Sequence, residues 1–171
     1  MKARFESLPI VNEDLGLITP DVRELMDRFG LPGMQVLLFP FGDDLARNPY
    51  VPHNHERNCL VYTGTHDNNT VRGWLETEMQ TGDRRRLDRY LGRSVDGENV
   101  VREMVRAALM SVARIAILPV QDVLGLGREA RMNTPAVAAG NWEWQLVEAQ
   151  LATATARELR EMTETYGRVP R

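Results

Sequence analysis

The chain alternates short, uniformly apolar runs with segments whose apolar residues recur at helical spacing. The runs cover residues 8–13, 34–39, 60–63 and 114–120. Within them, apolar residues stand next to each other instead of at every second position, which is typical of strands covered on both faces. Strands of this kind separated by helices predict an α/β protein built on a parallel sheet.

Local signals bound the helices between the runs. Thr19 as N-cap, Pro20 at the first helical position and Asp21 in the first turn predict a helix that ends at Gly30. Helical spacing also covers residues 70–79, residues 97–114 with an apolar stripe from Val100 to Val112, and a last segment of about 20 residues ending near Tyr166. Residues 39–58 are rich in Pro, Gly, Asn and Asp, which indicates a long functional loop.

Polar groups follow three of the apolar runs at the points where the strands should end. Glu13 and Asp14 follow the first run, Asp43 and Asp44 the second, and His66 and Asp67 the third. The carboxyl ends of parallel strands meet at one edge of a sheet, and active sites of such folds gather there. We therefore expect these side chains to share one rim.

Carboxylates at one rim could bind a divalent cation, or act as acid, base and electrostatic stabiliser on a neutral substrate. Asp14, Asp21 and Asp43 could equally cap helices or turns. The pair His53 and His55 lies in a segment of undefined geometry and is a weak metal signal. The sequence contains neither a nucleophile elbow nor a phosphate-binding glycine loop, which argues against a serine hydrolase and a nucleotide-binding protein.

Glycosyl transfer fits these groups better. A glycosidic bond needs a protonated carboxyl to assist the leaving oxygen and a carboxylate to stabilise oxocarbenium-like charge. Four aromatic residues, Phe39, Phe41, Trp142 and Trp144, could stack on sugar faces or could pack in the core or a lid. Both interpretations of these residues stay open at this point.

The composition of the chain limits the cellular locations and the kinds of partner that we expect. With 171 residues and a formal net charge of −3, the chain can form one core and does not resemble a nucleic-acid-binding protein. The basic run 84–86 is flanked by Asp83 and Asp88, which indicates a solvated helix face. The single Cys59 lies in an apolar run, which predicts a buried, unreactive thiol in a reducing compartment. Without a signal core or a membrane-length apolar stretch, we expect a cytoplasmic protein that contacts neither membrane nor nucleic acid.

Six segments carry a family resemblance. In chain order they read NEDLGLITPDV, FGLPGMQVLLFPFG, NPYVPHNHERN, VYTGTHDNNTVRGW, LPVQDVLGLGREARMN and GNWEWQL. Together they resemble the amylomaltase family of 4-α-glucanotransferases, which are related to α-amylases. The resemblance implies retaining transfer of an α-1,4-glucan segment to the 4-hydroxyl of glucose or another glucan, without a cofactor or metal. It also implies a (β/α)8 barrel, in which residues 1–171 would be a single partial domain, the C-terminal half with strands five to eight.

The same resemblance implies roles for single residues. Glu13 is similar to the family's general acid/base, and Asp67 to the carboxylate that stabilises the transition state. His66 resembles a hydrogen-bonding partner of the same sugar. Phe39, Asp43 and Asn133 resemble further substrate contacts.

One catalytic group of the family has no counterpart in this sequence. Family members carry their nucleophile, an aspartate, in an Arg-Ile-Asp-His type motif, whereas this chain has Arg114-Ile115-Ala116. We therefore expect a fragment that is inactive without the N-terminal half of the barrel. Two alternatives stay open: a non-catalytic half-barrel that binds glucans or a partner chain, and α-glucan hydrolysis in place of transfer. Unpaired strand edges would also permit a homodimer.

Overall fold

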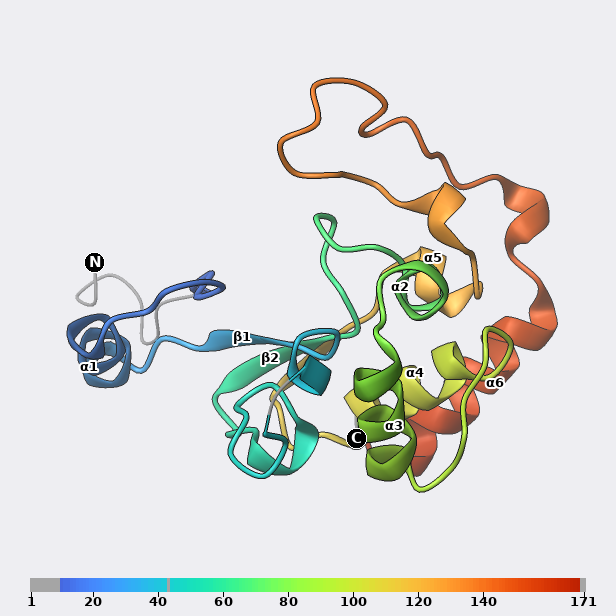
Figure 1. The fold of residues 1–171 in the computed structure, drawn as a ribbon. Coiled ribbons are helices and arrows are strands. Elements are labelled where there is room, and N and C mark those ends of the chain that lie inside the picture. The colour runs from blue at the N-terminus through green and yellow to red at the C-terminus, as the bar shows by residue number, and fades with distance from the viewer. Residues whose placement is uncertain (1–9, 43, 170–171) are drawn as a thin grey trace.

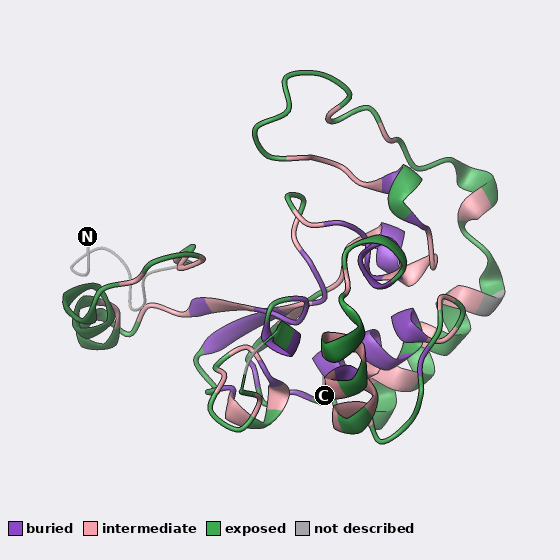
Figure 2. Ribbon diagram, viewed as in Figure 1, coloured by how far each residue is buried: buried purple, intermediate pink, exposed green. Residues whose placement is uncertain are grey.

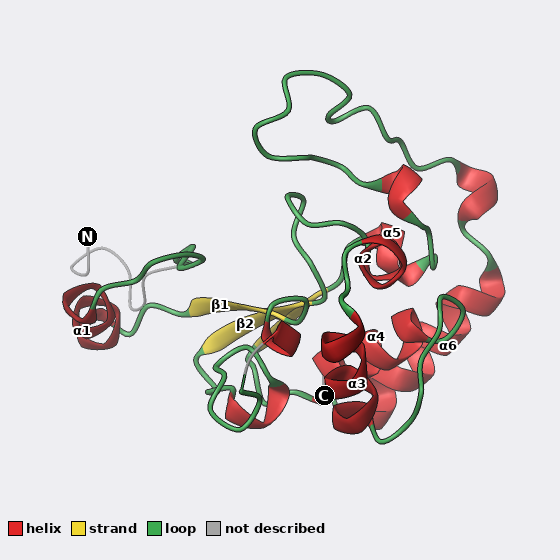
Figure 3. Cartoon of the chain, in the orientation of Figure 1, coloured by secondary structure: helices red, strands yellow, loops and turns green. Residues whose placement is uncertain are grey.

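The computed structural model describes residues 10–42 and 44–169, and the centre of this part is a parallel sheet of three strands (Figure 1). The strands β1 (Gly33–Val36), β2 (Cys59–Tyr62) and β3 (Ile115–Ile117) lie in that order. The helices are α1 (Pro20–Phe29), α2 (Val71–Thr77), α3 (Thr81–Leu91), α4 (Val100–Met110), α5 (Val120–Val123) and α6 (Thr153–Thr165). Short 3-10 helices cover Pro40–Gly42, Pro52–Asn54, Arg128–Ala130 and Glu148–Gln150 (Figure 3). The predicted α/β class with a parallel sheet is confirmed.

The first predicted strand is wrong for the part that the structure describes. Residues 10–13 are irregular, and residues 8 and 9 lie outside the described residues. One backbone hydrogen bond, from Asn12 N to Pro32 O at 3.0 Å, joins this segment to the residues before β1. The Asp14 carboxylate then accepts the Met34 amide at 2.6 Å, taking a β1 edge donor that a neighbouring strand would otherwise use. This approach needs Gly33, where an added Cβ would collide with Asp14.

Helix α1 forms where its caps predicted it. Gly30 adopts the left-handed conformation with φ 63° and ends the helix. The pKa of Asp21 is lowered, mainly by a hydrogen bond from the Thr19 side chain. Asp21 therefore interacts with the N-cap residue at the start of the helix. No residue of this helix is buried, and Figure 2 shows it exposed along its length at one side of the sheet. Three apolar side chains that share one face of α1 are at least partly exposed: Val22, Leu25 and Phe29.

The core lies between the sheet and the helices that follow β2. α4 packs against α2, α5 and α6, and its apolar stripe from Val100 to Leu109 is buried as predicted. Val112 departs from that prediction, because α4 ends at Met110 and the Val112 side chain is half exposed. Val36 and Val61 enter the same core from the strands.

Several segments are shorter than predicted. The fourth apolar run, 114–120, is a strand only over Ile115–Ile117, and its last residue, Val120, begins α5. The second apolar run is a strand only as far as Val36, and Leu37 and Leu38 are buried in a turn. α6 has 13 residues, fewer than predicted, because the non-helical backbone of Leu151 separates it from the 3-10 helix before it. Residues 39–42 and 44–58 belong to the predicted long loop and contain two short 3-10 helices.

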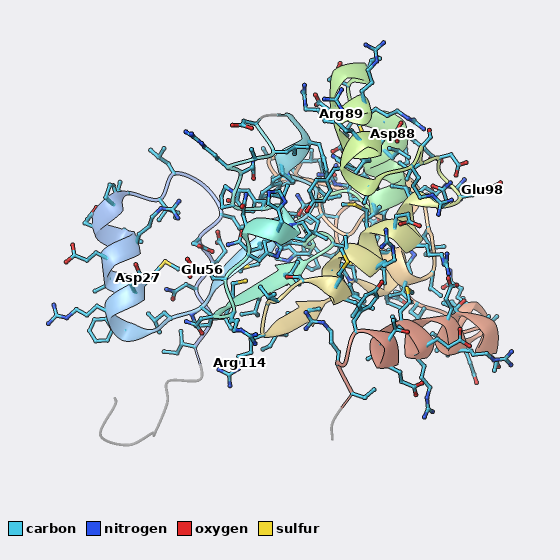
Figure 4. All side chains as sticks on the ribbon, turned by 90° about the horizontal axis from the view of Figure 1, so that it is seen from below. Asp27, Glu56, Asp88, Arg89, Glu98 and Arg114 are labelled. Carbon is cyan, nitrogen blue, oxygen red and sulfur yellow. The ribbon has the colours of Figure 1, made fainter. Side chains whose placement is uncertain are left out.

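The remaining structural predictions concern charge and exposure. The prediction of a solvated helix face for the basic run 84–86 is confirmed only in part. On α3, Arg85 is exposed, whereas the half-buried Arg84 and Arg86 donate to the carbonyls of Val95 and Phe41. Asp88 and Arg89 mark the same helix in Figure 4. Cys59 is buried, and burial raises the pKa of its thiol to about 11, as predicted for an unreactive cysteine. In the described part of the chain, no helix has the length and apolar character needed to cross a membrane.

Candidate active site

The carboxyl ends of the three strands border a cavity of about 650 Å³. Met34 of β1, Tyr62 of β2 and Ile117 of β3 supply its apolar wall. Its polar wall comes from the segment before α1 and from residues 64–68, which follow β2. Four of the predicted site residues line this cavity together: Glu13, Phe39, His66 and Asp67.

The residues that follow β2 form a turn that is fixed by its own side chains. The Asn68 carboxamide oxygen accepts hydrogen bonds from the backbone amide and the hydroxyl of Thr65, both at 2.9 Å. The backbone amide of Asn68 in turn donates to the backbone carbonyl of Thr65 at 3.2 Å. This local bonding explains why a polar His-Asp-Asn-Asn sequence can follow a buried strand, since the polar groups satisfy one another at the rim.

Asp67 is held by two neighbours at the same oxygen. Its Oδ1 accepts a hydrogen bond from Asn133 Nδ2 at 2.5 Å and lies 3.4 Å from His66 Nε2. Both His66 and Asp67 remain about half exposed. Among the described residues, none donates a hydrogen bond to Asp67 Oδ2, which leaves that oxygen able to accept a ligand hydroxyl.

Asn133 reaches the site from a different part of the chain than His66 and Asp67. It is not among the residues that line the 650 Å³ cavity. Its backbone amide donates to the His66 carbonyl at 3.0 Å, and its side chain holds Asp67. Arg131 reinforces this contact by donating to the carbonyls of Asn133 and Asp67, each at 2.8 Å. In this structure Asn133 therefore contacts the acid rather than the cavity.

Glu13 lines the same cavity from irregular backbone that precedes α1. Its carboxylate is exposed and accepts the Leu15 amide at 3.2 Å. The neighbouring Asp14 points the other way, to β1. The two adjacent acids thus have different tasks: Asp14 fixes the segment, and Glu13 faces the cavity.

The aromatic candidates divide into core and rim. Phe41 is buried and packs against Trp74, so its core interpretation is confirmed. Phe39 is exposed at the cavity and contacts the Tyr50 ring edge-on with centroids 5.1 Å apart. Trp142 is exposed, has an unusual φ of 62°, and lies against the His66 ring at 5.1 Å. Positive φ at a bulky residue is strained and is typically found near functional sites.

Other predicted groups do not join the cavity. Asp43 lies outside the described residues. His53 contacts the Tyr90 hydroxyl, whereas His55 is buried against Ser111 and the Tyr50 carbonyl, so the two histidines serve different neighbours. The described residues contain no group of three or more metal-binding side chains.

Sequence reasoning missed Asp122. This carboxylate is 1% exposed, on α5, and it accepts hydrogen bonds from Thr63 and from the Val71 amide. Burial raises the pKa of Asp122, and the two hydrogen bonds oppose that shift. The available signal was an aspartate among apolar residues in the segment LPVQDV, because a buried acid requires partners.

The chain is similar to known proteins over most of its length. The sequence profile of the 4-alpha-glucanotransferase family matches residues 1–150. A chloroplastic/amyloplastic 4-alpha-glucanotransferase of Solanum tuberosum is 48% identical over 163 residues, which are 94% of this chain and 28% of that protein. A 4-alpha-glucanotransferase of Thermus thermophilus is 45% identical over 171 residues, covering 96% of this chain and 34% of the relative.

Solved structures agree with the sequence comparison. An amylomaltase from Streptococcus agalactiae in complex with acarbose matches with a TM-score of 0.90 and 31% identity, over 97% of this chain and 33% of that one. An amylomaltase from Corynebacterium glutamicum has a TM-score of 0.63 at 18% identity, which is a likeness of fold, over 94% of this chain and 28% of that one. The chain therefore spans about a third of the length of these relatives.

Proposed function

The chain belongs to the 4-alpha-glucanotransferase family, and from that premise we propose that its cavity is part of a site that transfers α-1,4-glucan segments with retention of configuration. The observation that carries this proposal is the meeting of Glu13, Phe39, His66 and Asp67 around one cavity at the strand ends. A neutral sugar needs this combination of an acid, a charge-stabilising carboxylate, a hydrogen-bonding ring and an apolar surface.

Each group then has a defined task. Glu13 protonates the leaving glycosidic oxygen and later removes the proton from the acceptor hydroxyl. Asp67 uses Oδ2 to hold hydroxyls of the distorted sugar while Asn133 and His66 fix Oδ1, so the carboxylate meets developing positive charge in one orientation. His66 hydrogen-bonds to the same sugar, and Phe39 supports a neighbouring ring.

A retaining reaction also needs a nucleophile about 5 Å from the acid/base. Among the described residues that line the cavity, Glu13 and Asp67 are the two carboxylates, and both already have roles. The nucleophile is therefore not among these described residues, and we propose that the N-terminal part of the barrel supplies it. The alternative function is glucan binding without catalysis. The lack of a further carboxylate among the described cavity residues favours it for the chain without a partner.

We place the chain as the C-terminal half of a (β/α)8 barrel, with residues 1–171 as one partial domain. One surface supports a partner that completes it. Strand β3 has Ile115 and Ile117 more than a third exposed, and Arg114 marks the start of this strand in Figure 4. The N-terminal half of the barrel would pair with this strand and cover these side chains, and a homodimer through the β3 edge is the alternative.

The testing experiment measures turnover of maltotriose. The chain is assayed alone and mixed with the separately expressed N-terminal part of a related 4-alpha-glucanotransferase, and products are separated by chromatography. Glucose together with longer oligosaccharides in the mixture, and none from either part alone, supports transfer by a completed site. Shorter products without longer ones indicate hydrolysis.

Two controls make the result interpretable. The mixture is repeated with Glu13→Gln, which keeps the side-chain shape and removes the transferable proton. Acarbose binding to the chain alone is measured by calorimetry, because this compound is bound by the Streptococcus agalactiae relative. Acarbose binding without turnover in any mixture favours the alternative of a half-barrel that binds glucans without catalysis. Turnover by the chain alone contradicts the proposal that the chain lacks a nucleophile.

A further inference from the structure

The loop that carries His66 and Asp67 is fastened at its base by one buried side chain. Asp122 Oδ2 accepts the Thr63 hydroxyl at 2.5 Å, and Oδ1 accepts the Val71 amide at 2.8 Å. Thr63 is the residue before the loop 64–70, and Val71 is the residue after it. One carboxylate therefore joins both ends of the loop.

The local chemistry makes this connection strong. Thr63 and Asp122 are almost inaccessible to water, at 0% and 1% exposure, so neither can exchange its partner for solvent. Val71 is the first residue of α2, and its amide is one of the helix-start donors that lack an intrahelical acceptor. A carboxylate suits that position because it also meets the positive end of the helix dipole. Hydrogen bonds to a charged group are about twice as strong as neutral ones.

The loop also borders open space. A cavity of about 170 Å³ is lined by Asn68 and Asn69 of the loop and by Gln121 and Arg131 of other segments. Contacts with neighbouring side chains are fewer on the side of a segment that borders a cavity. Particular hydrogen bonds at the base and at the tip of the loop therefore gain importance for its position.

The tip has a second fastening. Arg131 donates to the Asp67 carbonyl and also to Glu78 at 3.0 Å, and Glu78 in turn accepts from Asn69 at 2.9 Å. This fastening holds the tip and does not join the two ends of the loop to each other. The base contact at Asp122 is the one that couples the loop to β2 and to α2 together.

We propose that Asp122 is a positioning residue, which holds the loop 64–70 by its two ends and thereby fixes the place of Asp67 at the cavity. The consequence for sugar binding rests on the function proposed above. The fastening of the loop does not, because it can be measured without any ligand.

The test uses the whole chain and variants of the Thr63 arm, which does not touch α2. Thr63→Val removes the hydroxyl at nearly constant shape, and Thr63→Ser keeps it. Amide hydrogen exchange of Thr65 and Asn68 is followed by NMR. We expect exchange to become about tenfold faster in the valine variant and to stay within about threefold of the original chain in the serine variant.

A matched control separates loop fastening from general stability. Glu103 is another buried carboxylate, 3% exposed and paired with Arg93 and Arg106 far from the loop in sequence. Glu103→Gln should lower the global stability and leave exchange at Thr65 and Asn68 unchanged. Equal loosening by this variant, or no loosening by Thr63→Val, would overturn the proposal. Asp122→Asn is expected to accelerate amide exchange of the loop more than Thr63→Val does. If Asp122→Asn does not fold, the comparison of Thr63→Val with Thr63→Ser decides the question.

Acarbose affinity supplies the functional readout. It should fall about tenfold in Thr63→Val and recover in Thr63→Ser, in parallel with the exchange rates. A loosened loop with unchanged affinity would overturn the claim that Asp122 positions Asp67. If the original chain does not bind acarbose, the proposed function fails, and the exchange rates alone decide whether Asp122 fastens the loop.

Discussion

The contact between Asn133 and Asp67 can be tested by exchanging one atom. Asn133→Asp keeps the shape of the side chain and replaces the Nδ2 donor, 2.5 Å from Asp67 Oδ1, with an acceptor that carries negative charge. Asn133→Ala removes the contact without adding charge. If Asn133 matters because it holds the acid, the aspartate variant should be the worse of the two.

The magnitudes follow from the distance and the exposure. A hydrogen bond to a charged group contributes about 1.5–3 kcal/mol, and the half-exposed Asp67 justifies a value near 1 kcal/mol, so the alanine variant should lose about fivefold in affinity. Two carboxylates that relax to about 4 Å repel by about 1 kcal/mol in water-like surroundings. Asn133→Asp should then lose about 2 kcal/mol, roughly thirtyfold in acarbose affinity.

Calorimetric titration of acarbose into the three chains provides the measurement, and urea unfolding of each shows whether the fold is retained. A purely substrate-contacting Asn133 predicts the reverse order, because aspartate would keep an acceptor for a sugar hydroxyl and alanine would not. Equal or tighter binding by Asn133→Asp relative to Asn133→Ala would refute the assigned contact.

Three further outcomes are expected. In the completed enzyme, Glu13→Gln should abolish transfer of maltotriose and retain acarbose binding, and unchanged turnover would remove Glu13 from acid/base catalysis. Gly73→Ala should cost about 1–3 kcal/mol in urea unfolding, because its Cβ would lie 2.8 Å from Arg128 backbone atoms, whereas Gly82→Ala in α3 meets nothing nearer than 3.9 Å and should be near neutral. Burial lowers the pKa of His55, so the folded state binds fewer protons than the unfolded state. The contribution of His55 to the free energy of unfolding should therefore be fully present above about pH 6.5 and decrease below it. A urea midpoint that does not change with pH below about 6.5 would contradict this.

Local signals in the sequence predicted the elements that depend on local interactions. The caps at Thr19 and Gly30 bound α1, and the apolar stripe of α4 is buried, because both depend on neighbours within a few residues. Residues 10–13 depend on a partner strand instead, and the hydrogen bond from Met34 to Asp14 replaces that pairing. An apolar run alone does not specify whether a partner strand is present.

The sequence predicted that Glu13 and Asp67 share one rim, but it did not predict the contacts that support them. Asp67 follows β2, where the rule for parallel strands predicted it. Glu13 lines the same cavity from irregular backbone, so the prediction of its place was right although the strand predicted before it does not form among the described residues. The bond between Asn133 and Asp67 joins residues 66 positions apart, and the bond between Thr63 and Asp122 joins residues 59 apart. Contacts of such separation depend on how the chain closes, which neither spacing nor periodicity encodes.

Among the described residues, the two acids of the cavity, Glu13 and Asp67, are supported to different degrees. Asp67 is fixed through Asn133 at its side chain, through Arg131 at its carbonyl, and through the loop ends at Asp122. Glu13 sits on irregular backbone, which among the described residues is joined to Pro32 by the Asn12 amide and to β1 by the Asp14 side chain. A neighbouring strand would supply the missing backbone hydrogen bonds along residues 10–13 and would stiffen Glu13 in the same step. Under the proposed function, completion of the sheet would order Glu13 as well as bring the nucleophile, and a maltotriose assay should respond to both at once.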